Sequence, residues 1–353
     1  MSHTTDGTGP DDEPSATDAT DTTGSADATD TTGVADAIDS SIAGRTVLVT
    51  GGAGFIGAHV AAALAGANDV RVFDDLSTGE RKNVPADATL IEGDVRDRET
   101  LADAMAGVDL VFHLAAMVSV PQSVEQPDTC QSVNTGGTVK LLERARIEDA
   151  RVILSSSAAI YGRPARIPIE EGDPKTPRSP YGISKLAADG YVRAYADLYG
   201  LETVSLRYFN VYGAYRGSGE PGGGVVATFV KRARANQQLV IEGDGSQTRD
   251  FVHTTDIVRA NLAAATTEHT GEAYNVSTGT SVTIDELAGT IRDLNGSDVP
   301  IVHADARTGD IERSRADPAN ARRDLGYEPT VPLADGLASL LGIEREASIE
   351  TDS

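Results

Sequence analysis

The chain has 353 residues, of which 39% are hydrophobic, and this length is enough for a large core or for two domains that share an interface. Its formal net charge is −24, and no basic stretch offsets it, which argues against binding to nucleic acid. The acidic, polar start differs from a secretory signal, and no apolar run has the length of a membrane span. A single cysteine, Cys130, rules out an internal disulfide framework. These features predict a cytoplasmic protein that does not associate with membranes.

The acidic charge is concentrated in the first part of the chain but is not confined to it. Residues 1–43 hold ten Asp or Glu and no Lys or Arg, so the remaining residues carry about −14 of the total of −24. Asp18–Gly24 recurs unchanged as Asp27–Gly33, and few large apolar residues are present, so we expect residues 1–43 to be disordered. Residues 344–353 are expected to be similarly loose. The acidic remainder predicts a halophilic surface, with an ordinary acidic protein as the alternative.

From Gly44 onward, apolar segments of strand length alternate with segments of helix length. The expected strands are 46–50, 70–74, 89–94, 110–116, 151–157 and 203–210. The expected helices between them are 56–67, 98–106, 135–146 and 185–199. This alternation predicts a doubly wound parallel sheet, a Rossmann α/β fold, over residues 44–207. Glycine and proline then interrupt the pattern, so residues 208–343 are expected to form a smaller α/β lobe.

A glycine-rich loop follows the first expected strand and opens the first expected helix, with glycines at 51, 52, 54 and 57. Glycine lets the backbone turn sharply and approach a pyrophosphate, and the helix start offers free N–H groups. Asp74 ends the next strand, where a carboxylate can accept hydrogen bonds from ribose hydroxyls and would repel a 2′-phosphate. The combination predicts a site for NAD rather than NADP, and a simple turn is the alternative.

Tyr181 and Lys185 form the chain's single Tyr-x-x-x-Lys pair, and this spacing puts both side chains on one helical face. A neighbouring cation lowers the pKa of a phenol and favours its use as a base. Ser157 ends an expected strand 24 residues earlier, where its hydroxyl can hydrogen-bond a reacting oxygen. We interpret the three as catalytic residues; the alternative is that they are ordinary surface and strand-end residues.

These motifs, together with His113–Ala116 and Leu206–Asn210, resemble the extended short-chain dehydrogenase/reductase superfamily and, within it, the UDP-glucose 4-epimerase family. The resemblance runs from about Arg45 to about Leu341. It implies a 4-epimerase that binds NAD and oxidises a nucleotide sugar transiently at C4. It also implies a homodimer formed through two helices of each subunit, one of which carries Tyr181.

The resemblance also implies roles for individual residues. The cofactor-binding residues that it implies are Gly51, Gly54, Phe55, Ile56, Gly57, Asp74, Asp75, Asp94, Val95, Leu114, Ala115, Ala116, Asn134, Tyr181, Lys185 and Phe209. The substrate-binding residues that it implies are Ser157, Tyr181, Asn210, Arg249, Arg307, Asp310 and Ser314. Two guanidinium groups suit a diphosphate, which Arg249 and Arg307 are expected to hold.

Departures from the family pattern narrow the chemistry. Ala158 and Ala159 stand where the related 4,6-dehydratases carry an Asp-Glu pair, and alanine cannot move the protons that dehydration needs. Ser314 stands where relatives restricted to plain hexoses carry tyrosine, which predicts that N-acetylated sugars are also accepted.

Two alternatives to a 4-epimerase remain. One is a reductase or synthase of the same fold, and the other is a non-catalytic NAD-binding scaffold. No metal site is expected, and His113, Cys130 and His253 are interpreted as structural residues.

Overall fold

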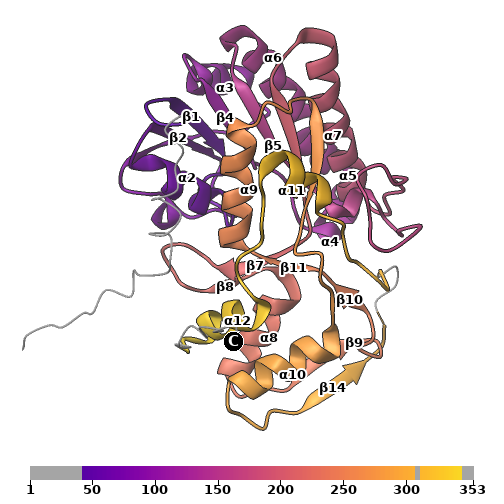
Figure 1. Ribbon diagram of the computed structural model, residues 1–353. Helices are drawn as coiled ribbons and strands as arrows, with labels where there is room; N and C mark the ends of the chain where they lie inside the picture. The colour runs from indigo at the N-terminus through magenta and orange to yellow at the C-terminus, as the bar shows by residue number, and fades with distance from the viewer. Residues whose placement is uncertain (1–41, 307–310, 344–353) are drawn as a thin grey trace, which may run out of the picture.

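The structure is a computed structural model that describes residues 42–306 and 311–343. Its larger lobe is built on a seven-stranded parallel sheet with the order β12-β6-β5-β4-β1-β2-β3 (Figure 1). The strands are β1 (Thr46–Thr50), β2 (Asp69–Asp74), β3 (Ala88–Glu92), β4 (Leu110–His113), β5 (Arg151–Ser157), β6 (Thr203–Tyr208) and β12 (Glu272–Val276). The strand order reverses between β1 and β4, and such a reversal opens a crevice at the carboxyl ends of the strands. The predicted Rossmann fold is confirmed.

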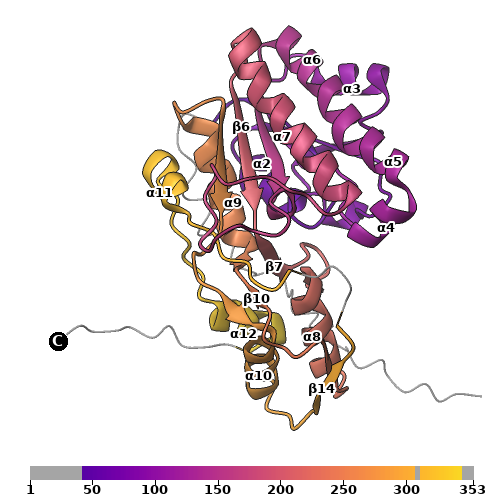
Figure 2. The ribbon, with the colours of Figure 1, turned by 90° about the vertical axis from the view of Figure 1, so that its right-hand side faces the viewer.

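Helices cover both faces of this sheet (Figure 2). On one face lie α2 (Gly57–Ala65), α9 (Thr254–Thr266) and α11 (Ala319–Leu325), and on the other α3 (Arg98–Met105), α6 (Thr138–Glu148) and α7 (Pro180–Tyr199). The strand sequences explain the two layers, because successive side chains point to opposite faces. In β1, Val47 and Val49 pack toward α2 and α9, whereas Leu48 packs toward α3, α6 and α7. Strands buried on both faces have nearly continuous apolar sequences.

The smaller lobe lies at the carboxyl ends of the strands and has a core of its own (Figure 1). Its sheets are β11-β7-β8, β10-β13 and β14-β9. Their strands are β7 (Asn210–Ala214), β8 (Pro221–Gly222), β9 (Leu239–Glu242), β10 (Thr248–Arg249), β11 (Phe251–His253), β13 (Val282–Thr283) and β14 (Ile301–Ala304). The helices α8 (Gly224–Arg234), α10 (Ile284–Leu294) and α12 (Leu333–Leu341) bury Phe229, Leu287 and Leu337 between them.

Helix α7 begins earlier than the sequence pattern indicates, at Pro180 instead of residue 185. Ser179 caps it, because the serine side chain accepts a hydrogen bond from the backbone N–H of Gly182, and a proline is favourable at the first helical position. Tyr181 therefore lies in the first turn of α7. Upstream, α4 (Val120–Glu125), α5 (Pro127–Gln131) and the π-helix η2 (Ser132–Gly137) precede α6, so the expected helix 135–146 begins at Thr138.

Two segments expected in the smaller lobe lie instead with the large sheet. Strand β12 pairs in parallel with β6, and α9 packs beside α2, although both follow residue 208. Burial explains the placement, because Tyr274 and Val276 of β12 and Ile257 of α9 join the core of the large lobe. Ile42, within the predicted 1–43 tail, is also buried there, at 2% exposure. Residues 1–41 and 344–353, which the sequence predicts to be loose, lie outside the described residues.

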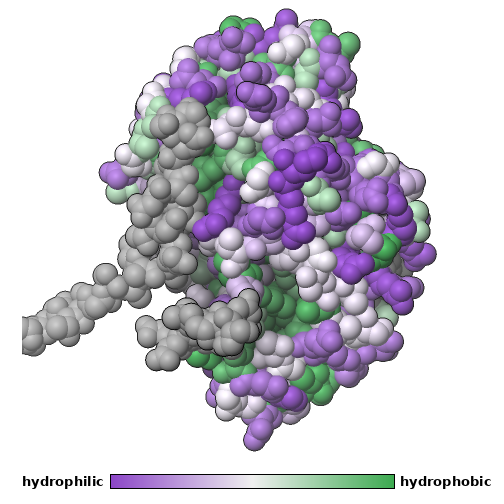
Figure 3. Space-filling view, in the orientation of Figure 1, coloured by the Kyte–Doolittle hydropathy of each residue, from purple (hydrophilic) through white to green (hydrophobic). Residues whose placement is uncertain are grey.

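The face of the molecule seen in Figure 3 is predominantly hydrophilic, with apolar residues in small areas. In the part of the chain that the structure describes, no helix combines the length and the hydropathy that crossing a membrane requires.

Candidate active site

The loop between β1 and α2 packs so tightly that two of its positions require glycine. Gly51 has a φ of +68°, and a Cβ there would lie 2.7 Å from the backbone nitrogen of Ala115. A Cβ at Gly57 would lie 2.2 Å from the carbonyl oxygen of Gly51. The loop therefore lies directly against the segment that follows β4, where Leu114, Ala115 and Ala116 are half-buried. The hydroxyl of Thr50 accepts a hydrogen bond from the Ala115 backbone at 3.2 Å and fixes that segment.

The start of α2 offers donors that suit an anion. Ile56 is the N-cap residue, and its side chain makes no capping hydrogen bond. The backbone N–H groups of Phe55 and Ile56 have no acceptor among residues 42–306 and 311–343. Unpaired N–H groups at a helix start, with the positive end of the helix dipole, are the arrangement that binds a diphosphate. The residues present therefore fit the pyrophosphate of a dinucleotide.

Asp74 links this loop to the end of β2. Its two carboxylate oxygens accept hydrogen bonds from the backbone N–H groups of Ala53 and Leu76, each at 2.9 Å. The side chain is buried, and burial raises its pKa, an effect that the two hydrogen bonds oppose. Asp75 is exposed and accepts hydrogen bonds from the backbone and hydroxyl of Ser77. Asp74 thus already holds the loop in place, and its predicted contact with a ribose would use the remaining lone pairs.

The residues expected near the adenine and the nicotinamide have different surroundings. Asp94 pairs with Arg96, whose hydrogen bonds lower the pKa of the carboxyl group, and Val95 is buried against Gly137. Asn134 is 2% exposed, and its amide exchanges two hydrogen bonds with the Met117 backbone and donates a third to the Ser184 hydroxyl. Its polar atoms are thus used within the protein, so a direct contact between Asn134 and the cofactor stays a prediction.

Ser157, Tyr181 and Lys185 come together at the carboxyl end of β5. The Ser157 side chain lies close enough to the Tyr181 phenol to lower its pKa, and the Tyr181 backbone donates to the buried Ser123 hydroxyl at 3.2 Å. Lys185, 4% exposed, donates from Nζ to the Ser155 carbonyl at 2.6 Å. The first turn of α7 and the end of β5 together hold the set.

The pKa of the Tyr181 phenol differs in direction from the sequence-based expectation. Burial raises this pKa, and the hydrogen bond from Ser157 opposes the rise. Lys185 does not offset the burial, because its ammonium group is directed to the Ser155 carbonyl. Burial lowers the pKa of Lys185 itself to about 8, so the amine is still mainly protonated at neutral pH.

A cavity of about 200 Å³ opens beside Ser157, and we refer to it as the Ser157 cavity. It brings together five residues that the sequence assigns to the site: Ser157, Phe209, Asn210, Arg249 and Ser314. Arg249 donates from Nη1 to the carbonyls of Thr248 and Ile311, which holds β10 to the segment that carries Ser314. Arg307 and Asp310, also predicted to bind substrate, lie outside the described residues.

Sequence reasoning missed several residues that line this cavity. Arg313 supplies a second guanidinium group beside Arg249, and its position follows from a β-bridge to Thr248. Gly162, Pro164 and Ile169 enter from the loop after β5. The signal available for Arg313 was its place next to Ser314, but a single arginine in an irregular segment is also typical of a surface ion pair.

The histidines and the cysteine have structural surroundings. His113 lies between the hydroxyls of Thr50 and Thr138, and burial lowers its pKa to about 3. His253 caps α9 by accepting a hydrogen bond from the Thr255 backbone. Cys130 is buried as a free thiol. Within residues 42–306 and 311–343, no three His, Cys, Asp or Glu side chains gather as a metal-binding group.

Residues 47–277 match the family model described as the NAD dependent epimerase/dehydratase family. The chain belongs to this family. The match covers the glycine loop, the Ser157, Tyr181 and Lys185 set, and all seven strands of the large sheet except the first residue of β1. NAD is therefore the cofactor class of this protein, in agreement with the prediction from Asp74.

Individual relatives cover nearly the whole described chain. A UDP-glucose 4-epimerase of Mycolicibacterium smegmatis is 38% identical over 85% of this chain and 99% of its own. The structure of a UDP-N-acetylglucosamine 4-epimerase from Methanobrevibacter ruminantium, in complex with UDP-N-acetylmuramic acid, has a TM-score of 0.80 and 34% identity, covering 85% of this chain and 98% of its own. The structure of the Thermus thermophilus UDP-glucose 4-epimerase in complex with NAD has a TM-score of 0.77 and 36% identity. The match covers 84% of this chain and 98% of the Thermus thermophilus chain.

Proposed function

We propose that this protein is an NAD-dependent 4-epimerase of nucleotide sugars. The observation that carries the proposal is the position of Ser157, which acts on the pKa of the Tyr181 phenol and at the same time lines the Ser157 cavity. A sugar in that cavity would present a hydroxyl to Ser157 and to the phenol. Relatives named UDP-glucose 4-epimerase that align with 80% or more of the chain support the same reaction.

In this proposal the Tyr181 phenolate takes the proton of the sugar 4-hydroxyl, and Ser157 hydrogen-bonds the same oxygen. NAD, when bound, supplies the reversible hydride acceptor that such a reaction needs. Lys185 carries a positive charge at neutral pH, since its pKa is about 8, and it favours the phenolate when its ammonium turns from Ser155 toward the site. The 4-keto sugar then rotates and is reduced on its other face, so the protein catalyses no net oxidation.

We assign the rest of the Ser157 cavity to the nucleotide sugar. Arg249 and Arg313 are suited to the diphosphate, because guanidinium groups make paired, charge-assisted hydrogen bonds with phosphate oxygens. Phe209 and Asn210 lie where β6 ends and β7 begins, between the two lobes. Ala158 and Ala159 also line the cavity, and neither can serve as the acid or base of a dehydratase.

The decisive experiment incubates the purified protein with UDP-glucose, UDP-galactose and their N-acetylated counterparts and identifies the products by NMR. We expect inversion at C4 with no accumulation of NADH. Stoichiometric NADH together with an oxidised sugar would favour a reductase or synthase of the same fold. Binding of NAD without turnover of any nucleotide sugar in the panel would favour a non-catalytic scaffold.

We infer that the protein forms a homodimer through α4, α6 and α7. All eight large apolar side chains that are exposed in the described residues lie on these helices or directly before α4: Val118, Val120, Val124, Ile147, Ile183, Tyr191, Leu198 and Tyr199. Exposed apolar residues that gather on one side of a molecule mark an interface.

Light scattering of the purified protein should give the mass of a dimer. Ile183→Glu with Leu198→Glu should give the monomer mass, whereas the control pair Gln237→Glu and Gln238→Glu, on an exposed turn of the smaller lobe, should leave the dimer intact.

We also propose that the protein works in a cytoplasm of high salt concentration. The net charge of −24 supports this proposal, because salt screens the repulsion between its carboxylates. The buried free thiol of Cys130 suits a reducing compartment. Activity and thermal stability should both rise as the KCl concentration is increased from about 0.1 to about 3 M, because salt at these concentrations screens charges over short distances. A maximum at the lowest concentration would contradict the halophilic assignment.

A further inference from the structure

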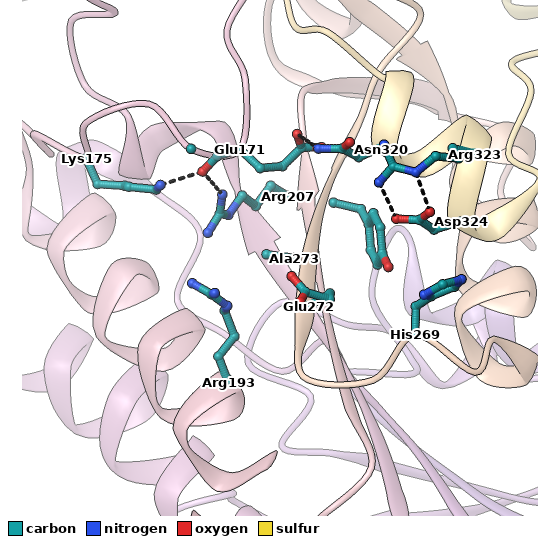
Figure 4. A pocket seen from close by; sticks show the side chains of 12 residues that line it. Glu171, Lys175, Arg193, Arg207, His269, Glu272, Ala273, Asn320, Arg323 and Asp324 are labelled. Atoms are coloured by element: carbon teal, nitrogen blue, oxygen red, sulfur yellow. Dashed lines mark hydrogen bonds and ion pairs between the residues drawn. The ribbon is translucent and has the colours of Figure 1, made fainter. Parts of the chain in front are cut away.

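A second and larger cavity, of about 640 Å³, lies against the outer strand of the large sheet (Figure 4). We call it the edge cavity. Its walls come from β12, the end of β6, α7, α11 and the loop that contains residues 171–175. It shares no lining residue with the Ser157 cavity. The edge cavity is thus a separate place in the fold.

One end of the edge cavity is cationic. Lys175, Arg193 and Arg207 direct their side chains to this end (Figure 4). Arg207 is neutralised by Asp189, but neither Lys175 nor Arg193 forms an ion pair with a carboxylate in the described part of the chain. Each donates to a backbone carbonyl, Lys175 to Glu171 at 2.5 Å and Arg193 to Gly271 at 3.4 Å.

The cations at this end repel one another. Burial lowers the pKa of Lys175, the positive charges of Arg207 and Arg193 lower it further, and the carboxylates of Asp189 and Asp173 oppose them. A dianion between Lys175 and Arg193 would remove this repulsion and would bind through charge-assisted hydrogen bonds. Lys175 and Arg193 thus present two cations to the edge cavity of a protein whose net charge is −24.

Beyond the cationic end, the edge cavity is lined by Glu272 and, farther along, by Asp324 and Arg323 (Figure 4). Glu272 forms no ion pair among the described residues, and Asp324 is held by Arg323 through two hydrogen bonds of 2.7 Å. The hydroxyl of Tyr274 is buried and lies beside Asp324, so it is not open to a ligand in the edge cavity. Carboxylates are partners for the hydroxyls of a sugar or polyol.

We propose that the edge cavity binds a phosphorylated sugar or polyol. Its phosphate lies between Lys175 and Arg193, and its hydroxyls face the carboxylates of Glu272 and Asp324. The volume of about 640 Å³ falls within the range of small-molecule sites, roughly 300–1,000 Å³. A free anion would use the cationic end alone, whereas a sugar phosphate uses both ends and is therefore bound more tightly.

Arg207 connects this cavity to the Ser157 cavity. Its Nη1 donates to the Tyr161 hydroxyl at 2.9 Å and to the Glu171 carbonyl at 3.0 Å. Tyr161 directly follows Ala158–Ile160, whose first two residues line the Ser157 cavity. A ligand beside Arg207 is therefore connected to the wall of the active site through two side chains, those of Arg207 and Tyr161.

The test is isothermal titration of the holoenzyme with glucose 6-phosphate, inorganic phosphate and glucose, each in saturating UDP so that the Ser157 cavity is blocked. We expect one site per chain for glucose 6-phosphate, weaker binding of phosphate and no binding of glucose. Lys175→Ala with Arg193→Ala should weaken the binding of glucose 6-phosphate at least tenfold. The control pair Arg98→Ala and Lys231→Ala, which removes two exposed cations elsewhere, should leave it unchanged.

Arg193→Ala alone provides a variant whose folding is not in question, since Arg193 is exposed on α7. It should weaken glucose 6-phosphate binding several-fold. The proposal is overturned if the wild type binds none of the three probes, if UDP abolishes the binding of glucose 6-phosphate, or if the double variant and its control bind it equally. Equal binding of phosphate and glucose 6-phosphate would overturn the assignment of the hydroxyl end.

Discussion

Arg207 of β6 and Asp189 of α7 form an ion pair that is almost fully buried, with Nη2 and Oδ1 2.9 Å apart and both side chains 1–2% exposed. A second bond joins Arg207 Nε to Asp189 Oδ2 at 3.0 Å, and the Ser205 hydroxyl donates to the same oxygen at 2.7 Å. The pair fixes the helix that carries Tyr181 and Lys185 to the strand that leads to Phe209. The geometry of the catalytic set thus depends on a charge pair outside it.

Asp189→Ala should lower the free energy of unfolding by about 3–5 kcal/mol, because it leaves the Arg207 guanidinium buried without a counter-charge. Urea denaturation followed by circular dichroism measures this loss. Glu170→Ala, which removes one partner of the exposed Arg166 pair, should cost about 1 kcal/mol or less. Similar losses for the two variants would show that the buried pair has no special contribution to stability.

Tyr181→Phe should reduce 4-epimerisation by about 10²–10⁴-fold, because it removes the acid–base group and keeps the ring. The variant should retain bound NAD, since the glycine loop and Asp74 are untouched. Turnover with UDP-glucose, together with mass spectrometry of the released cofactor, separates the two effects. A loss below tenfold in a folded variant that retains NAD would remove Tyr181 from its proposed role.

Lys185→Met should change how stability depends on pH. The pKa of Lys185 is lowered to about 8 in the folded protein, whereas the ordinary value of 10.5 applies to the unfolded chain. Between these values the unfolded chain binds more protons, so the wild type gains stability as the pH rises from about 8 to 10.5, by about 3 kcal/mol at most. The methionine variant lacks this gain. Urea unfolding of both proteins at pH 7.5 and 10.5 compares them, and parallel changes would contradict the lowered pKa.

Ser314→Tyr should restrict the enzyme to sugars without a 2-acetamido group. Ser314 lines the Ser157 cavity and is 8% exposed, so a tyrosine there must enter the space in front of Ser157. Overpacking of this kind typically costs about 1–3 kcal/mol. The ratio of kcat/KM for UDP-N-acetylglucosamine to that for UDP-glucose should therefore fall by roughly 5–150-fold. If wild type and variant have the same ratio, position 314 does not select the substrate.

Two deletions should distinguish the acidic tail from the folded start of the chain. Removal of residues 1–41 is expected to leave turnover nearly unchanged in high-salt buffer, since the segment has few residues that can join a core. Removal of residues 1–43 also takes away the buried Ile42 and should lower stability by about 1.5–3 kcal/mol. Thermal unfolding and turnover of both proteins test the boundary, and equal stability would place it after Ile42.

The fold was largely predictable because the strands of the large sheet carry strong local signals. Val47–Thr50 and Val152–Leu154 are apolar runs bounded by polar residues, and the turn after β1 contains glycines that no other residue could replace. The edge strand β12 was missed because it is short and lies after residue 208, where glycine and proline interrupt the alternation of strands and helices. Nothing local to Glu272–Val276 shows that it pairs with β6, since that pairing depends on tertiary burial.

The site was predictable where chemistry is tied to sequence spacing, as for Tyr181 and Lys185. The site was not predictable where a side chain hydrogen-bonds a group that is distant in sequence and belongs to no motif. Lys185 donates to the Ser155 carbonyl and Asn134 bonds Met117 and Ser184, and neither contact is encoded in a motif. The start of α7 at Pro180 was readable from the Ser179 cap and the proline, but the expected helix began later because the apolar periodicity is clearer after Lys185.

The pairing of β12 with β6 has a consequence for synthesis on the ribosome. Strand β6 ends at Tyr208, and its outer neighbour begins only at Glu272, after most of the smaller lobe has been made. Until β12 emerges, the nascent sheet exposes a row of unpaired N–H and C=O groups along β6, and such edges attract other chains. Any premature stop between these strands leaves a product with that open edge. The interval of translation from Tyr208 to Val276 is thus the period in which the outer edge of β6 is open to pairing with another chain.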